Sequence, residues 1–186
     1  MAVSSSTSRR SAIIIMLLAG AATAITLGVI GSTHGSDYQP LPTFGFSSTQ
    51  SLKAWLGSVV LLLVAGQLLT ALWMYGKLGG TRSIPGRVYV THRMIGRAAF
   101  LLSLPVAFYC LYSFGFARDV TDPRTLIHSV AGCLFYGTFV SKMITIRSRR
   151  LSRWALPVLG GVVFTSFVVA WATSALWWFN TVGLSR

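Results

Sequence analysis

The sequence has very few acidic residues. Its 186 residues include three Asp and no Glu, against 16 Lys and Arg, and only 10% of the residues are charged. A typical soluble domain is about 25% charged, so this chain lacks the polar surface that water requires. Hydrophobic residues make up 53% of the sequence. The composition therefore excludes an ordinary soluble globular domain and favours a membrane protein.

The long apolar runs contain no carboxylate, because Asp37, Asp119 and Asp122 all lie in the links between them. Proton- and sodium-coupled pumps usually need Asp or Glu in the membrane path, so the sequence argues against that class. It also has no G-x-S-x-G, H-E-x-x-H or phosphate-binding-loop motif. We therefore expect no catalytic residues and no metal site, and a non-enzymatic role is favoured.

Five apolar runs are long enough to cross a bilayer, which takes about 20 residues per helix. The sequence predicts an all-α integral membrane bundle, with an N-terminal tail of residues 1–10 and a single transmembrane domain over 11–186. The first run exceeds the roughly 7–15 apolar residues of a secretory signal, which indicates a retained helix. The predicted helices span about 11–31, 52–76, 87–116, 125–146 and 154–180.

Lys and Arg are distributed unevenly between the two sets of links. The positive-inside rule then predicts a multi-pass protein of the cell membrane, with the N-terminus cytoplasmic and the C-terminus outside. The expected partner of the basic side is the anionic inner leaflet rather than nucleic acid. The predicted inner residues are Arg9, Arg10, Lys77, Arg82, Arg87, Arg93, Arg97, Lys142, Arg147, Arg149, Arg150 and Arg153, and the predicted outer ones are Lys53, Arg118, Arg124 and Arg186.

His128 is an imidazole in an otherwise apolar helix, in the segment HSVAGCLFYG. One hypothesis is a b-type haem in the outer half of the membrane, because imidazole is a common axial ligand to haem iron. Gly132, one turn after His128, would give the porphyrin room. His34 lies just past the first predicted helix on the same side, and Tyr109 lies at a similar depth, so either could be the second ligand.

The alternative is that His128 is a structural residue near a helix end. Asp122 is a plausible N-cap and Pro123 a plausible first helical residue of the fourth predicted helix. His128 would then bond Ser129, Tyr109 or a neighbouring backbone carbonyl, and so join the third and fourth helices.

His92 lies at the opposite, inner end of the membrane and cannot share one iron with His128. Arg93 and Arg97 are one turn apart and share a helix face, so with His92 they could bind an anion or a lipid headgroup. The alternative is that both arginines reach lipid phosphates as topology anchors.

Two cysteines, Cys110 and Cys133, lie within apolar runs. A free cysteine packs like a small hydrophobic residue, which is one interpretation of both. If the two helices are neighbours, the thiols could lie at similar depth, and a disulfide is the other interpretation. Spacing along the sequence does not decide between them, because pairing depends on the distance between the two Cα atoms.

Three segments carry a family resemblance: HRMIGRAAFLLSLPVAFYCLYSFGF, RTLIHSVAGCLFYGTFVSKM, and WALPVLGG followed by WATSALWWF. They resemble a family of small multi-pass membrane proteins of high-GC bacteria, catalogued only as a domain of unknown function. The resemblance covers the second to fifth predicted helices and implies no activity. It also implies relatives with His in place of Tyr109, giving a haem-type pair of which this chain keeps only His128.

Two functions are therefore carried forward. The first is a non-catalytic accessory or anchor subunit of a membrane complex, plausibly a redox complex, since the links are short and no catalytic set is present. The second is a small electron-transfer protein with haem b bound to His128. A channel or small-molecule transporter is disfavoured, because the helices lack a continuous polar stripe.

Overall fold

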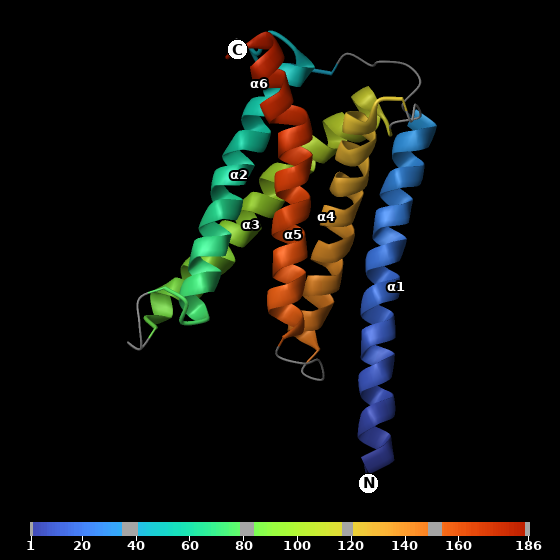
Figure 1. Ribbon diagram of the computed structural model, residues 1–186, viewed down its shortest axis with the longest axis vertical. Helices are drawn as coiled ribbons and strands as arrows, with labels where there is room; N and C mark the ends of the chain where they lie inside the picture. Colours follow the sequence, from blue (N-terminus) through green and yellow to red (C-terminus); the bar gives the residue numbers. More distant parts are fainter. Residues whose placement is uncertain (1, 35–40, 79–83, 117–120, 149–153, 185–186) are drawn as a thin grey trace.

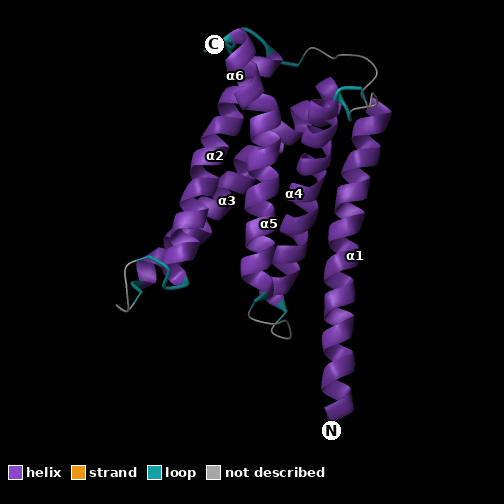
Figure 2. Cartoon of the chain, viewed as in Figure 1, coloured by secondary structure: helices purple, strands orange, loops and turns teal. Residues whose placement is uncertain are grey.

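The computed structural model describes residues 2–34, 41–78, 84–116, 121–148 and 154–184. Over these ranges the chain is helical and contains no strand (Figure 2). The segments η1 and η2 are short π-helical stretches, the first continuing α3 and the second joining α5 to α6. The elements are α1 (Ala2–His34), α2 (Thr49–Met74), α3 (Gly86–Tyr109), η1 (Cys110–Phe114), α4 (Pro123–Arg147), α5 (Ala155–Trp171), η2 (Ala172–Leu176) and α6 (Trp177–Val182).

Five helical stretches in the described part are long and apolar enough to cross a membrane. Large apolar side chains such as Leu18, Leu62 and Leu101 are exposed on their outer surfaces, as expected where lipid is the solvent. The all-α arrangement of five long helices confirms that part of the prediction and fits a multi-pass membrane protein. The stretches are Arg9–His34, Thr49–Met74, Gly86–Phe114, Pro123–Arg147 and Ala155–Val182.

The helix ends differ from their predicted positions. Helix α1 begins at Ala2 rather than near residue 11, and it includes His34, which was expected just past the helix. The third predicted helix changes to π geometry at Cys110, and the fifth does so at Ala172. Hydropathy marks only the apolar part of a helix, whereas polar flanking residues can continue the same hydrogen-bond ladder.

Successive long helices run in alternating directions, so the two termini lie at opposite ends of the bundle (Figure 1). We call the end where α1 finishes and α4 begins the upper end. Helix α1 packs mainly against α4 at one edge, while α2 packs against α3 and α4 packs against α5. Figure 1 shows α3 crossing obliquely behind the other helices, from the lower end of α2 toward the upper end of α4.

The largest buried cluster lies where α2, α3, α4 and α5 meet. Its rings, Phe135 and Phe167, have centroids 5.3 Å apart. A smaller cluster at the upper end joins α2 to η2 and α6 through Ala54, Ala175 and Trp178. The main cluster consists of Val60, Val64, Ala99, Phe135 and Phe167.

Basic residues concentrate at the lower end of the described bundle. Arg9 and Arg10 are near the start of α1, Arg87 is near the start of α3, and Arg147 ends α4. Lys53 and Arg124 lie at the upper end, near the starts of α2 and α4. The residues used in the charge prediction that lie outside the described residues are Asp37, Arg82, Arg118, Asp119, Arg149, Arg150, Arg153 and Arg186.

Candidate functional site

A cavity of about 330 Å³ occupies the upper half of the bundle. It lies between α3 with η1 on one side and α4, α5 and η2 on the other, and α2 contributes Gln50 and Lys53. The lining residues of α3 and η1 are Ser103, Val106, Ala107, Cys110, Leu111 and Phe114, and those of α4 include Arg124, Thr125, His128, Ser129, Gly132, Cys133 and Tyr136. Both sets recur every three or four residues, so each helix presents one face to the cavity.

The cavity is elongated along the helices. The α4 residues from Arg124 to Tyr136 line it, and at about 1.5 Å per residue this stretch is roughly 18 Å long. Phe135 and Phe167 belong to both the cavity lining and the buried cluster. The cations Lys53 and Arg124 line the upper end of the cavity, which we call its mouth. The cavity is therefore positively charged at its mouth, and its lower part is lined by the two rings together with Ser103 and Tyr136.

The two cations at the mouth have different partners. Arg124 forms the only ion pair among the described residues, with Asp122 at 3.3 Å, and it donates a hydrogen bond to the Thr173 carbonyl at 2.9 Å. Its guanidinium also lies 3.9 Å from the centroid of the Trp177 ring. The ammonium of Lys53 lies 4.4 Å from the centroid of the Phe114 ring and pairs with no carboxylate in the described part. Among the described residues, the positive charge of Lys53 is therefore not compensated, which favours an anion.

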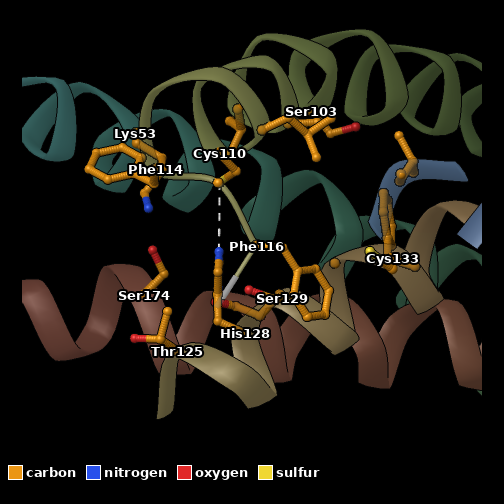
Figure 3. A pocket seen from close by; sticks show the side chains of 18 of the residues that line it. Lys53, Ser103, Cys110, Phe114, Phe116, Thr125, His128, Ser129, Cys133 and Ser174 are labelled. Atoms are coloured by element: carbon orange, nitrogen blue, oxygen red, sulfur yellow. Dashed lines mark hydrogen bonds between the residues drawn. The ribbon is translucent and has the colours of Figure 1, made fainter. Parts of the chain in front are cut away.

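A thiol and an imidazole face each other across the cavity, with Cys110 on η1 and His128 on α4 (Figure 3). The Cys110 Sγ atom lies 3.6 Å from Nε2 of His128, and Nδ1 of His128 lies 2.9 Å from the Ala170 carbonyl oxygen. A carbonyl oxygen only accepts hydrogen bonds, so Nδ1 carries the proton. In the neutral ring the lone pair on Nε2 therefore points at the thiol.

Two π-helical segments lie next to this site. Cys110 is the first residue of η1, the carbonyl of Thr173 belongs to η2, and the carbonyl of Ala170 lies in the last turn of α5, just before η2. A π turn interrupts the regular i→i+4 ladder, and such turns occur often at functional sites. Arg124 and His128 are four residues apart and share one face of α4. They reach these two carbonyls and join the upper parts of α4 and α5.

The structure does not place the predicted second haem ligands beside His128. His34 is exposed and hydrogen-bonds the Ile30 carbonyl, and its ring packs on Tyr112 with centroids 4.9 Å apart. The Tyr109 hydroxyl donates to the Pro42 carbonyl. Neither His34 nor Tyr109 lines the cavity, whereas Gly132 does, and a Cβ atom at Gly132 would meet no atom within 4 Å.

The predicted anion group at the lower end is divided between two environments. His92 is half-buried, with its Nδ1 atom 2.8 Å from the Thr70 hydroxyl on α2, and its carbonyl accepts a bond from Gln67. Arg93 and Arg97 are exposed on the surface of α3. His92 thus joins α2 to α3, and the two arginines face outward.

Comparison with known proteins gives one match, to a protein family. The sequence profile of a family of unknown function, DUF6529, matches residues 13–186. The chain belongs to DUF6529. No curated protein and no solved structure matches the chain. The resemblance to an uncharacterised family is confirmed in that form, and the origin in high-GC bacteria stays a prediction.

Cys110 is the site residue of this DUF6529 chain that the sequence did not assign. Its sequence signal was weak: an apolar environment in which a cysteine normally packs as a hydrophobe. In the structure Cys110 and Cys133 are both free and both line the cavity. The expectation that they lie at similar depth was the available clue, but the contact with His128 depends on which faces α3 and α4 turn toward each other.

Asp122 caps the helix that carries His128, as predicted. Its side chain accepts bonds from the backbone N–H groups of Arg124 and Thr125, and Pro123 is the first helical residue. The Thr125 hydroxyl also donates to the Asp122 carboxylate. This hydroxyl, with the backbone N–H of Thr125 and the charge of Arg124, lowers the pKa of Asp122, which lies outside the membrane-crossing segments.

The lowered pKa predicts a loss of stability in acid. A carboxylate with a depressed folded-state pKa stabilises the fold above the ordinary Asp pKa of about 3.9, and this contribution is lost as the pH falls through the lowered value. We expect Asp122→Asn, which keeps one capping oxygen, to unfold at a lower temperature than wild type near pH 6. The thermal unfolding midpoints of the two proteins should converge at about pH 3 or below, where the carboxylate is protonated. Equal midpoints at neutral pH in detergent would contradict the role of the charge.

Proposed function

We propose that this DUF6529 chain is a multi-pass protein of the cell membrane whose upper cavity binds an amphipathic anion, with the anionic headgroup at the mouth and an apolar chain inside. In this function the protein is a lipid-binding accessory protein. The observation that carries the proposal is the shape and charge of the cavity. Its lining extends about 18 Å along α4 and includes the rings of Phe135 and Phe167, with Lys53 at its mouth.

The proposed orientation places the cavity in the outer leaflet. Basic residues concentrate at the lower end, which the positive-inside rule assigns to the cytoplasm. The lining of α4 extends about 18 Å from Arg124 to Tyr136. The hydrocarbon core of a bilayer is about 30 Å thick, so one leaflet contributes about half of that. The cavity therefore has roughly the length that one lipid chain of the outer leaflet occupies.

The other hypotheses from the sequence have less support from the site. A haem bound to His128 would use Nε2, which faces Cys110 at 3.6 Å, and its expected second ligands lie outside the cavity lining. Transport is less favoured because Phe135 and Phe167, which line the cavity, belong to the buried cluster where α2, α3, α4 and α5 pack together. A role as an accessory subunit, plausibly in a redox complex, is compatible with lipid binding and stays a prediction.

The headgroup contact is tested by reversing its charge. We expect wild type purified in mild detergent to retain an anionic lipid, detected by native mass spectrometry and by analysis of extracted lipid. Lys53→Glu should lower its occupancy at least about tenfold, because a charge-assisted contact is replaced by repulsion. Lys77→Glu is the matched control, since Lys77 is an exposed lysine just past the other end of α2. Equal occupancy in both variants would contradict the proposal.

The apolar part of the cavity is tested by filling it. Gly132→Phe places a ring in the cavity, and Gly161→Phe places one on the exposed face of α5, where an added Cβ also meets no atom within 4 Å. We expect the first substitution to displace the lipid while the bundle stays folded, and the second to leave the lipid bound. Retention of the lipid by Gly132→Phe would mean that the chain lies elsewhere.

A further inference from the structure

Lipid binding by itself does not require the pair of thiol and imidazole inside the cavity. Ionisable side chains within the membrane are costly and mark functional sites. Here Cys110 Sγ is 3.6 Å from Nε2 of His128, and Nδ1 of His128 is fixed 2.9 Å from the Ala170 carbonyl. A nucleophile beside a base, with the base oriented by a third group, is the arrangement of an activated nucleophile.

The depth of the thiol matches the chemistry of a lipid ester. Cys110 precedes Phe114, whose ring contacts the ammonium of Lys53, by four residues of η1. It therefore lies about one helical turn, roughly 5–6 Å along the helix, from the residue whose ring contacts this cation. In a glycerophospholipid the ester carbonyls lie just below the phosphate. A phosphate at Lys53 would bring an ester carbonyl to the level of the Cys110 sulfur.

We propose that Cys110 is an acyl-accepting nucleophile, that His128 is its general base, and that an anionic glycerophospholipid in the cavity is the acyl donor. This inference rests on the proposed lipid-binding function and names its ligand class and chemistry. It requires no metal, oxidant or reductant, because acyl transfer changes no oxidation state.

The transfer is balanced among groups that line the cavity. Nε2 of His128 takes the proton from the Cys110 thiol, and the sulfur attacks the ester carbonyl carbon. The tetrahedral intermediate collapses with cleavage of the carbon–oxygen bond, and the leaving glycerol oxygen takes the proton back from Nε2. The products are a thioester on Cys110 and one lysophospholipid. Nδ1 keeps its proton throughout and donates it in the hydrogen bond to the Ala170 carbonyl, which holds the ring in place.

Lys53 provides positive charge for this step. It lines the same cavity as Cys110 and His128, and Figure 3 shows Lys53 and Ser174 on one side of the pair. Negative charge develops on the former carbonyl oxygen during the attack, and a fixed cation nearby stabilises it, strongly so in a water-poor site. The same ammonium can thus position the phosphate and favour the intermediate.

Cys133 is an internal control for the reactivity of Cys110. It is free and lines the same cavity, but the structure gives it no imidazole partner among the described residues. A general affinity of the cavity for electrophiles would modify both cysteines. Activation by His128 modifies Cys110 alone.

The test uses the full chain reconstituted in phosphatidylglycerol vesicles, with phosphatidylcholine vesicles and a soluble acyl thioester as separate arms. We expect the intact mass to rise by one acyl chain on Cys110 in the anionic vesicles, with one lysophospholipid released and the adduct cleaved by neutral hydroxylamine. Cys110→Ala should abolish the adduct. His128→Asn, which keeps an N–H for the Ala170 carbonyl, should slow acylation at least about 100-fold, whereas His92→Asn should not change it.

The outcomes separate the two proposals. If native mass spectrometry shows bound anionic lipid but Cys110 stays unmodified, acylation is wrong and lipid binding stands. If no lipid binds, the proposed function is wrong. Acylation by the thioester alone would overturn the phospholipid as donor. A variant-free measurement completes the test: iodoacetamide should alkylate Cys110 faster than Cys133 in wild type, and equal rates would overturn the activation of Cys110.

Discussion

Replacing Gly137 by leucine is expected to separate α1 from α4. A Cβ atom at Gly137 would lie 2.6 Å from the Gly20 carbonyl oxygen and 3.0 Å from Cβ of Ala24. A Cβ at Gly20 would in turn lie 2.8 Å from the Gly137 carbonyl oxygen. These obstacles are largely backbone atoms, so no side-chain rotation relieves them. Small residues of this kind let membrane helices approach closely, because lipid provides no hydrophobic force between them.

The effect is large because α1 has few other contacts. Helix α1 packs mainly on α4, and the hydrogen bond from the Ser141 hydroxyl to the Met16 carbonyl, 3.0 Å long, depends on the same approach. Overpacking of this kind costs about 1–3 kcal/mol of unfolding free energy. We expect a lower thermal midpoint in detergent. A disulfide between Met16→Cys and Thr145→Cys, which replace side chains in contact at 3.0 Å, should form in the parent chain and fail to form in Gly137→Leu.

Gly160→Ala is the control for this prediction. An added Cβ at Gly160 meets no atom within 4 Å, and alanine has a higher helix propensity than glycine by about 1 kcal/mol. Its midpoint should equal or slightly exceed that of wild type. If Gly137→Leu were equally stable and still formed the disulfide, the close contact between α1 and α4 would be disproved.

Arg124→Lys is expected to destabilise the upper end of the bundle, although it keeps the charge. The guanidinium binds the Thr173 carbonyl and the Asp122 carboxylate together and stacks over the Trp177 ring. An ammonium is a point charge and cannot make this planar set of contacts. A hydrogen bond to a charged group contributes about 1.5–3 kcal/mol, and a cation–π contact about 0.5–2 kcal/mol. Loss of part of both should cost about 2 kcal/mol in the free energy of unfolding.

The matched control is Arg147→Lys at the other end of the same helix. Arg147 is exposed in the last turn of α4, where either cation interacts favourably with the helix dipole. We expect its free energy of unfolding to stay within about 0.5 kcal/mol of the wild-type value. In Arg124→Lys, hydrogen exchange should also rise around η2. Equal behaviour of the two variants would show that Arg124 does not join α4 to η2.

The predictable part of the site follows from local rules. Asp122 and Pro123 mark the start of α4 because capping and the first helical turn depend on neighbouring residues only. A backbone carbonyl was among the expected partners of His128, but the carbonyl observed, that of Ala170, lies on α5 and not on the third helix. The pairing with His34 or Tyr109 was inferred from depth alone. Residues at equal depth on different helices meet only if the helices rotate their faces toward each other, and hydropathy does not report that rotation.

The sequence by itself determined five apolar helices, their alternating directions and the concentration of basic residues at one end. Each of these depends on composition over a window of about 20 residues, the length that a bilayer imposes. The tertiary structure decided what the sequence left open. The packing of α3, α4 and α5 rotates their faces toward one another and brings Cys110, at the start of η1, and the Ala170 carbonyl, just before η2, to His128. Helix rotation depends on packing between segments distant in sequence, which no local pattern encodes.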